Sequence, residues 1–113
     1  MKDYASMSDF EINKSVANIA MNGTWHVKPS HPDNDTGGWL YGSNGIQTHE
    51  LPDYCNSPAD AWPIITSSMI SIRPVGSDGQ LWEASGMAGM KADYDKNPLR
   101  AAMVVFLMMK EGE

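Results

Sequence analysis

The chain has 113 residues, 14 of them acidic and 8 basic, and its formal net charge is −6. This length fits one domain, predicted over residues 1–113, and the negative charge disfavours nonspecific binding to nucleic acid. Cys55 is the only cysteine, which excludes an internal disulfide and is typical of a protein from a reducing compartment.

The first predicted element is a helix over residues 9–21. Ser8-Asp9-Phe10-Glu11 has the capping-box pattern, in which the serine and glutamate side chains each accept from a backbone amide at a helix start. Apolar residues recur after it near helical spacing, and the polar residues between them, Asn13 included, are expected to face water. The apolar stripe comprises Phe10, Ile12, Val16, Ile19 and Ala20.

Residues 23–51 are predicted to form a loop-rich segment. They contain five of the ten glycines and all three histidines, with few aliphatic residues. We expect a short strand over residues 25–28, followed by a hairpin. The strands of that hairpin, 39–41 and 46–48, flank a Gly-Ser-Asn-Gly turn.

A second helix is predicted over residues 58–68. Asn56 to Asp60 repeats the chemistry of a helix start and places an acid in the first turn, whereas Pro63 predicts a kink or a short first turn. A sharper hairpin follows over residues 70–85, around a Gly-Ser-Asp-Gly turn. Pro74 is expected at an edge or a bulge of that hairpin, because it has no amide to donate.

A third helix is predicted over residues 98–110, preceded by a solvated loop of mixed charge from Lys91 to Lys96. Asn97 can cap the helix and Pro98 supplies a preset φ. Since Ala101 to Met109 is the longest apolar run, the helix should be buried, either within the monomer or in a homodimer. The core candidates on helical faces are Trp62, Ile65, Met69, Leu99, Met103, Phe106 and Leu107.

Together these elements predict an α+β fold in which a small antiparallel sheet built from hairpins is layered with three helices. The N-terminus carries acids where a signal peptide needs an apolar core. The apolar run near the C-terminus is far shorter than the ~20 residues that cross a bilayer. We therefore expect a cytoplasmic protein without a membrane partner.

Four segments carry a resemblance to a known family: SDFEIN (8–13), NSPADAWPII (56–65), ISIRPVG (70–76) and NPLRAAMVVFLMM (97–109). With these segments the chain resembles the phage NinX-like family, small proteins of lambdoid-type bacteriophages and prophages whose domain has no known function. The resemblance implies a phage-encoded protein made in the bacterial cytoplasm, with an α/β layered fold of helix, strand hairpin and helix. It implies no reaction, substrate or catalytic residue.

The candidate metal ligands are His26, His31 and His49. Imidazole, carboxylate and thiol groups are usual ligands of zinc or iron, but no spacing here fixes two of them on one rigid element. A solvated polar loop is the alternative interpretation. For Cys55 as a nucleophile with His49, no orienting group or oxyanion site is apparent. The other potential ligands nearby are Asp33, Asp35, Glu50 and Cys55.

The candidate partner-binding residues are Trp25, Trp39 and Tyr41. Aromatic rings next to glycines suit stacking on a peptide or a base, although they also suit packing within a twisted hairpin. Lys28 is the only basic residue nearby, so the positive charge that a nucleic-acid site needs is missing. A nucleic-acid partner is therefore not expected.

No stretch of the chain carries a recognisable catalytic or cofactor signature, and we expect no cofactor. The first hypothesis is a non-enzymatic phage accessory protein that binds a host or phage protein in the host cytoplasm. Its 98–110 helix is a candidate homodimer contact. The alternative is a small metal-dependent enzyme or metal-stabilised domain that uses the histidine, acid and cysteine cluster at 26–55.

Overall fold

The computed structural model describes residues 4–20, 25–27, 40–42, 49–77, 80–87 and 89–111, with the backbone alone at 25–27, 40–42, 49–50 and 111. A 3-10 turn, Tyr4–Ser6, precedes three helices and two antiparallel sheets in an α+β fold, as predicted. The helices are α1 (Asp9–Ala20), α2 (Pro58–Ser67) and α3 (Pro98–Glu111). The strands are β1 (Trp25–Val27), β2 (Leu40–Gly42), β3 (His49–Glu50), β4 (Ser71–Val75), β5 (Leu81–Gly86) and β6 (Lys91–Asp95).

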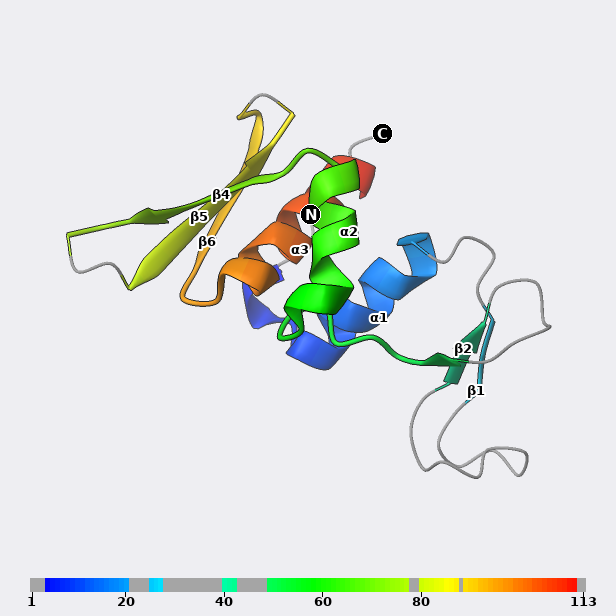
Figure 1. The fold of residues 1–113 in the computed structure, drawn as a ribbon. Helices are drawn as coiled ribbons and strands as arrows, with labels where there is room; N and C mark the ends of the chain where they lie inside the picture. The colour runs from blue at the N-terminus through cyan, green and yellow to red at the C-terminus, as the bar shows by residue number, and fades with distance from the viewer. Residues whose placement is uncertain are drawn as a thin grey trace.

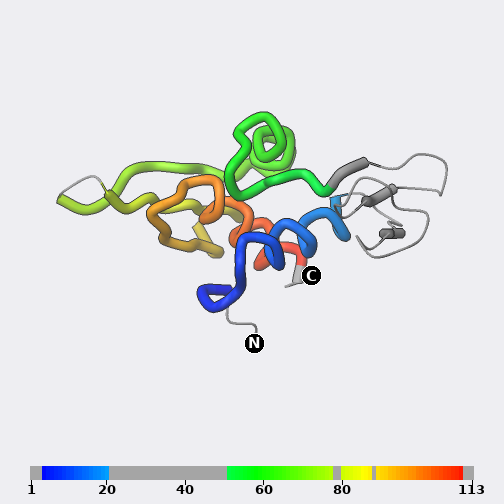
Figure 2. Tube along the Cα trace, turned by 90° about the horizontal axis from the view of Figure 1, so that it is seen from below, coloured from blue at the N-terminus to red at the C-terminus, as the bar shows by residue number. Residues whose placement is uncertain are grey.

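Helix α3 is the central element of the described structure. It contacts α1, α2 and all three strands of the sheet β4-β5-β6. In Figure 1 it lies between that sheet and the other two helices, and Figure 2 shows α1 and α2 on different sides of it. Every residue from Ala101 to Leu107 is buried within the single chain. The core therefore forms around α3.

The first sheet has the order β1-β2-β3. The strand predicted at 25–28 is present as β1, and β2 overlaps the strand predicted at 39–41. The register pairs Leu40 with Glu50 and Tyr41 with His49, so β2 pairs with residues 49–50. The predicted strand 46–48 lies outside the described residues.

The second sheet has the order β4-β5-β6 and contains the hairpin predicted over residues 70–85. Val75 pairs with Leu81 across the turn, and Pro74 stands on the edge strand β4, as its missing amide requires. The prediction of a solvated loop over Lys91 to Lys96 is wrong, because Lys91–Asp95 is strand β6. Its backbone pairs with β5, and the alternation of charged residues with Ala92 and Tyr94 is the two-residue period of a strand.

One row of side chains crosses this sheet from edge to edge. Arg73 pairs with Glu83 in the register, and Glu83 pairs with Tyr94. The Arg73 Nε donates to Glu83 Oε1 and the Tyr94 hydroxyl donates to Glu83 Oε2, each at 2.7 Å. These two hydrogen bonds lower the pKa of Glu83, the one from Arg73 more strongly.

Two residues predicted for the core are exposed instead. Helix α2 buries the stripe formed by Ala61, Ile64 and Ile65. Trp62 falls outside this stripe and is 61% exposed. Met69 comes after the end of the helix and is 84% exposed. Both predictions were wrong because spacing alone does not identify the buried side of a helix whose residues are apolar on several sides.

Asn13 was expected to face water but is buried, with 6% of its surface exposed. Its Nδ2 donates to Asp53 Oδ1, and its Oδ1 accepts from the Cys55 amide, both at 3.0 Å. The amide side chain therefore satisfies polar groups of the turn before α2, which explains why a polar residue lies on the core side of α1.

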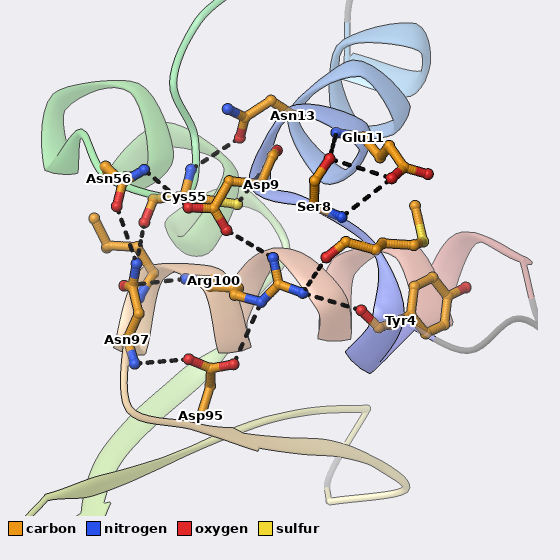
Figure 3. Close-up of polar contacts among 12 residues, drawn as sticks. Tyr4, Ser8, Asp9, Glu11, Asn13, Cys55, Asn56, Asp95, Asn97 and Arg100 are labelled. Atoms are coloured by element: carbon orange, nitrogen blue, oxygen red, sulfur yellow. Dashed lines mark hydrogen bonds and ion pairs between the residues drawn. The ribbon is translucent and has the colours of Figure 1, made fainter.

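Both predicted helix caps at the ends of the chain are present (Figure 3). Ser8 and Glu11 form the capping box, in which the Glu11 amide donates to Ser8 Oγ and the Ser8 amide to Glu11 Oε1. Asn97 Oδ1 accepts from the Leu99 and Arg100 amides at 2.9 and 3.3 Å. Its Nδ2 also donates to the Cys55 carbonyl at 2.6 Å, which ties the start of α3 to the turn before α2.

The Arg100 side chain joins the start of α3 to the N-terminal segment (Figure 3). Its Nη1 donates to Asp9 Oδ1 at 2.7 Å, and its Nη2 donates to the carbonyls of Tyr4 and Met7 at 3.0 and 2.6 Å. Its Nε lies 3.3 Å from Asp95 Oδ2, at the end of β6. One guanidinium thus holds three segments together.

Asn97→Ala should reduce the free energy of unfolding by about 1–2 kcal/mol, because it removes both the cap and the donor to Cys55. Denaturant unfolding measures this loss. Asn97→Ser is the control, since it keeps a capping oxygen without the long-range donor, and its stability should fall between those of the other two proteins. An Asn97→Ala variant as stable as the parent would contradict this assignment.

Asp93→Asn should stabilise the protein at neutral pH. Burial, and secondarily the charge of Asp95, raise the pKa of Asp93 above its ordinary value of 3.8. The free energy of unfolding therefore falls as the pH rises from 3.8 through the raised pKa, and above that pKa the full destabilisation by the Asp93 charge is present. The stabilisation by Asp93→Asn should vanish near pH 3.8.

Glu83→Gln is the control of opposite sign, because the pKa of Glu83 is lowered. The stability that Glu83 provides is present above the ordinary pKa of a glutamate and is lost as the pH falls through the lowered one. Denaturant unfolding of both variants across this pH range measures the two effects. A destabilising effect of Asp93→Asn at neutral pH would refute the prediction for Asp93.

Candidate functional site

The structure describes no side chain of the three predicted metal ligands. His31 is outside the described residues, and of His26 and His49 only the backbone is described, in strands β1 and β3. The register places both opposite Tyr41, on either side of β2. Within the described ranges, no three histidine, cysteine or acidic residues gather where they could hold a metal ion.

Cys55 is fully buried in the turn before α2. Its amide donates to Asn13, and its Sγ lies 3.9 Å from the carbonyl of Asp9. Burial, and next the negative charge of Asp9, raise the pKa of the thiol to about 12. The thiolate needed for nucleophilic attack or metal binding is therefore strongly disfavoured, and Cys55 has the character of a small core residue.

The predicted aromatic platform is only partly covered by the structure. Trp39 lies outside the described residues, whereas the backbones of Trp25 and Tyr41 lie in the neighbouring strands β1 and β2. The register pairs Trp25 with Gly42 and Tyr41 with His26. A role of these residues in partner binding stays a prediction.

Helix α2 ends in a Schellman motif that places a methionine where glycine is usual. The Ile70 amide donates to the Ile65 carbonyl at 3.0 Å and the Met69 amide to the Thr66 carbonyl at 3.3 Å. Met69 accordingly has φ +55°, in the left-handed region. A residue with a Cβ pays about 1 kcal/mol or more there, and the exposed Met69 side chain has little packing to offset that cost.

A second methionine, Met87, has the same left-handed backbone conformation as Met69. Met87 follows β5, has φ +54° and is 46% exposed. In the described part of the chain, Met69 and Met87 are the two residues other than glycine with a positive φ. Both methionines line a hollow of about 660 Å³ together with Met109 of α3.

We call Met69, Met87, Met90 and Met109 the methionine surface. The Met90 amide donates to the Met87 carbonyl, which places Met90 in the same turn, and its side chain is 77% exposed. The absence of a side chain at Gly86 leaves space for Met109, because a Cβ on Gly86 would lie only 2.7 Å from the Met109 Sδ. Flexible thioether side chains adapt to irregular partners and recur on protein-binding surfaces.

The sequence analysis did not identify this surface. It placed Met69 in the core and did not single out Met87 or Met90. One signal was available at Met69: the residue follows the apolar stripe of α2 at the position where a helix commonly ends with glycine. A methionine at such a position predicts an exposed side chain on left-handed backbone.

The predicted homodimer helix is covered within one chain over Ala101 to Leu107. A second copy that used α3 would therefore have to contact its last turns, where Met108 and Met109 are partly buried.

Among the described helices, none has the length and apolar character needed to cross a membrane.

These features describe a small α+β protein with an exposed, methionine-rich surface. A family model described as "Bacteriophage P22, NinX" matches residues 3–110 of the chain. The chain belongs to this phage family, as the resemblance at both termini and in the middle indicated. No match was found among curated proteins or among solved structures.

The thiol of Cys55 should not react with an aromatic disulfide reagent in the folded protein at neutral or mildly alkaline pH. The raised pKa leaves almost no thiolate, and the sulfur is buried. Absorbance of the released thiol measures the reaction, and the denatured protein is the positive control. Rapid stoichiometric modification of the folded protein would contradict this description of Cys55.

Proposed function

We propose that this phage accessory protein acts by binding another protein, of host or phage origin, in the cytoplasm of the bacterial host, and that it catalyses no reaction. The observation that supports this proposal is the methionine surface. Two of its members occupy left-handed backbone that glycine would adopt at lower cost.

A protein that only had to fold would gain stability from glycine at these positions. Strained backbone with an exposed apolar side chain is consistent with a role outside the fold, since strain persists where function maintains it. Contact with a partner would remove the apolar surface of Met69 and Met90 from water and provide the missing packing.

Met69→Gly and Met87→Gly should reduce partner capture while the free energy of unfolding stays the same or rises by up to about 1 kcal/mol. The measurement is affinity capture of the tagged protein from phage-infected bacteria, with mass spectrometry, next to denaturant unfolding of each variant. Such a result would separate binding from folding, because ordinary loss-of-contact variants lose stability as well.

The matched control is Trp62→Ala, which removes another large exposed apolar side chain that does not line the hollow. It should leave capture intact. If capture survives in the double glycine variant but is lost with Trp39→Ala or Tyr41→Ala, the aromatic residues and not the methionine surface carry the contact. The absence of any specific partner with the unaltered protein would refute the protein-binding proposal.

A further inference from the structure

A second hollow runs along α2 and is also lined by the end of α1, the turn before α2 and the later part of α3. Its volume is about 620 Å³, which is in the range of small-molecule sites. Its walls are partly apolar and partly polar, with Ser67 and Ser68 among the polar residues, and the polar side chains proposed to bind the ligand are Tyr54 and Asp60. The apolar walls include Ile19, Pro52, Pro63, Ile64 and Phe106, and the polar groups include Tyr54, Asp60 and Lys110.

Tyr54 lines this hollow with a hydroxyl that has no partner in the described structure. The residue is only 5% exposed, and no hydrogen bond joins its hydroxyl to another residue of the described ranges. A buried tyrosine hydroxyl usually has a partner, and leaving one without any costs about 1–3 kcal/mol. The hydroxyl is thus a donor for which the described residues supply no acceptor, on a residue that lines the hollow.

Asp60 places a carboxylate near this hydroxyl. The Asp53 amide donates to its Oδ2 at 3.0 Å, which fixes the side chain, while Oδ1 accepts no hydrogen bond from the described residues. Burial, and secondarily the charge of Asp60, raise the pKa of Tyr54, so that the hydroxyl keeps its proton. Tyr54 and Asp60, which both line the hollow, therefore offer a donor and an acceptor oxygen that the described residues leave without a partner.

We propose that this hollow, which we call the Tyr54 pocket, binds a small ligand with an apolar ring and an edge that carries an acceptor next to an N–H donor. A carboxamide or an amino-substituted nitrogen heterocycle has such an edge: its acceptor accepts a hydrogen bond from the Tyr54 hydroxyl, and its N–H donates to the Asp60 carboxylate. The apolar ring then lies against Ile64, Pro63 and Phe106. This site is separate from the methionine surface and does not depend on protein binding.

The first test needs no ligand. Tyr54→Phe removes only the hydroxyl, and because that hydroxyl has no partner among the described residues, the variant should be at least as stable as the parent in denaturant unfolding. A clear loss of stability would mean that the hydroxyl holds the fold together, and it would overturn the proposal.

The second test uses benzamide and 9-methyladenine as probes at millimolar concentration. Either probe should raise the melting temperature of the unaltered protein by about 3 °C or more and should have no such effect on Tyr54→Phe. Acetophenone and 9-methylpurine are the matched controls, since each lacks the N–H donor meant for Asp60, and they should give little or no shift.

A shift that persists in Tyr54→Phe, or equal shifts with the matched controls, would overturn the proposed recognition. So would the absence of any shift with both probes. The capture experiment is independent of these outcomes, and Tyr54→Phe should capture the protein partner as the parent does.

Discussion

The guanidinium of Arg100 and the side-chain amide of Asn97 determine how the described elements meet. Both belong to the start of α3, and between them they bind the N-terminal segment, the end of β6 and the turn before α2. Ion pairs of this kind stabilise little when exposed, but the Arg100 side chain is largely covered and donates to carbonyls that would otherwise need water. The junction thus connects the first turn of α3, directly before the buried run from Ala101 to Leu107, to three segments that are distant in the sequence.

The sequence was sufficient to predict the elements whose signals are local. The capping box at Ser8, the cap at Asn97 and the pairing of the strands β4 and β5 each follow from signals in a few neighbouring residues, and the structure contains all three. The errors concern tertiary neighbours. Asn13 is buried because the turn at Asp53 to Cys55, some forty residues away, supplies its hydrogen-bond partners. Strand β6 exists because β5 pairs with it, and its own charged residues favoured a loop.

The candidate sites were harder to predict for the same reason. The methionine surface unites residues from the end of α2, the turn after β5 and the end of α3, and no spacing in the sequence relates them. The Tyr54 pocket depends on a hydroxyl for which the described part of the chain supplies no partner, and this is a property of the surroundings and not of the residue type. The histidines and tryptophans that the sequence analysis singled out lie in the segment where the structure describes at most the backbone.

Pro74 has a consequence for how copies of this protein behave at high concentration. Strand β4 is one edge of its sheet, and an exposed edge is a template on which another chain can add a strand. Pro74 interrupts the row of amides along β4, and the other edge, β6, carries the charged residues Lys91, Asp93 and Asp95, which are a common means of opposing strand addition at a sheet edge. Edge-to-edge aggregation through this sheet is thereby opposed at both edges, so the protein can keep apolar methionines exposed nearby without polymerising through its strands.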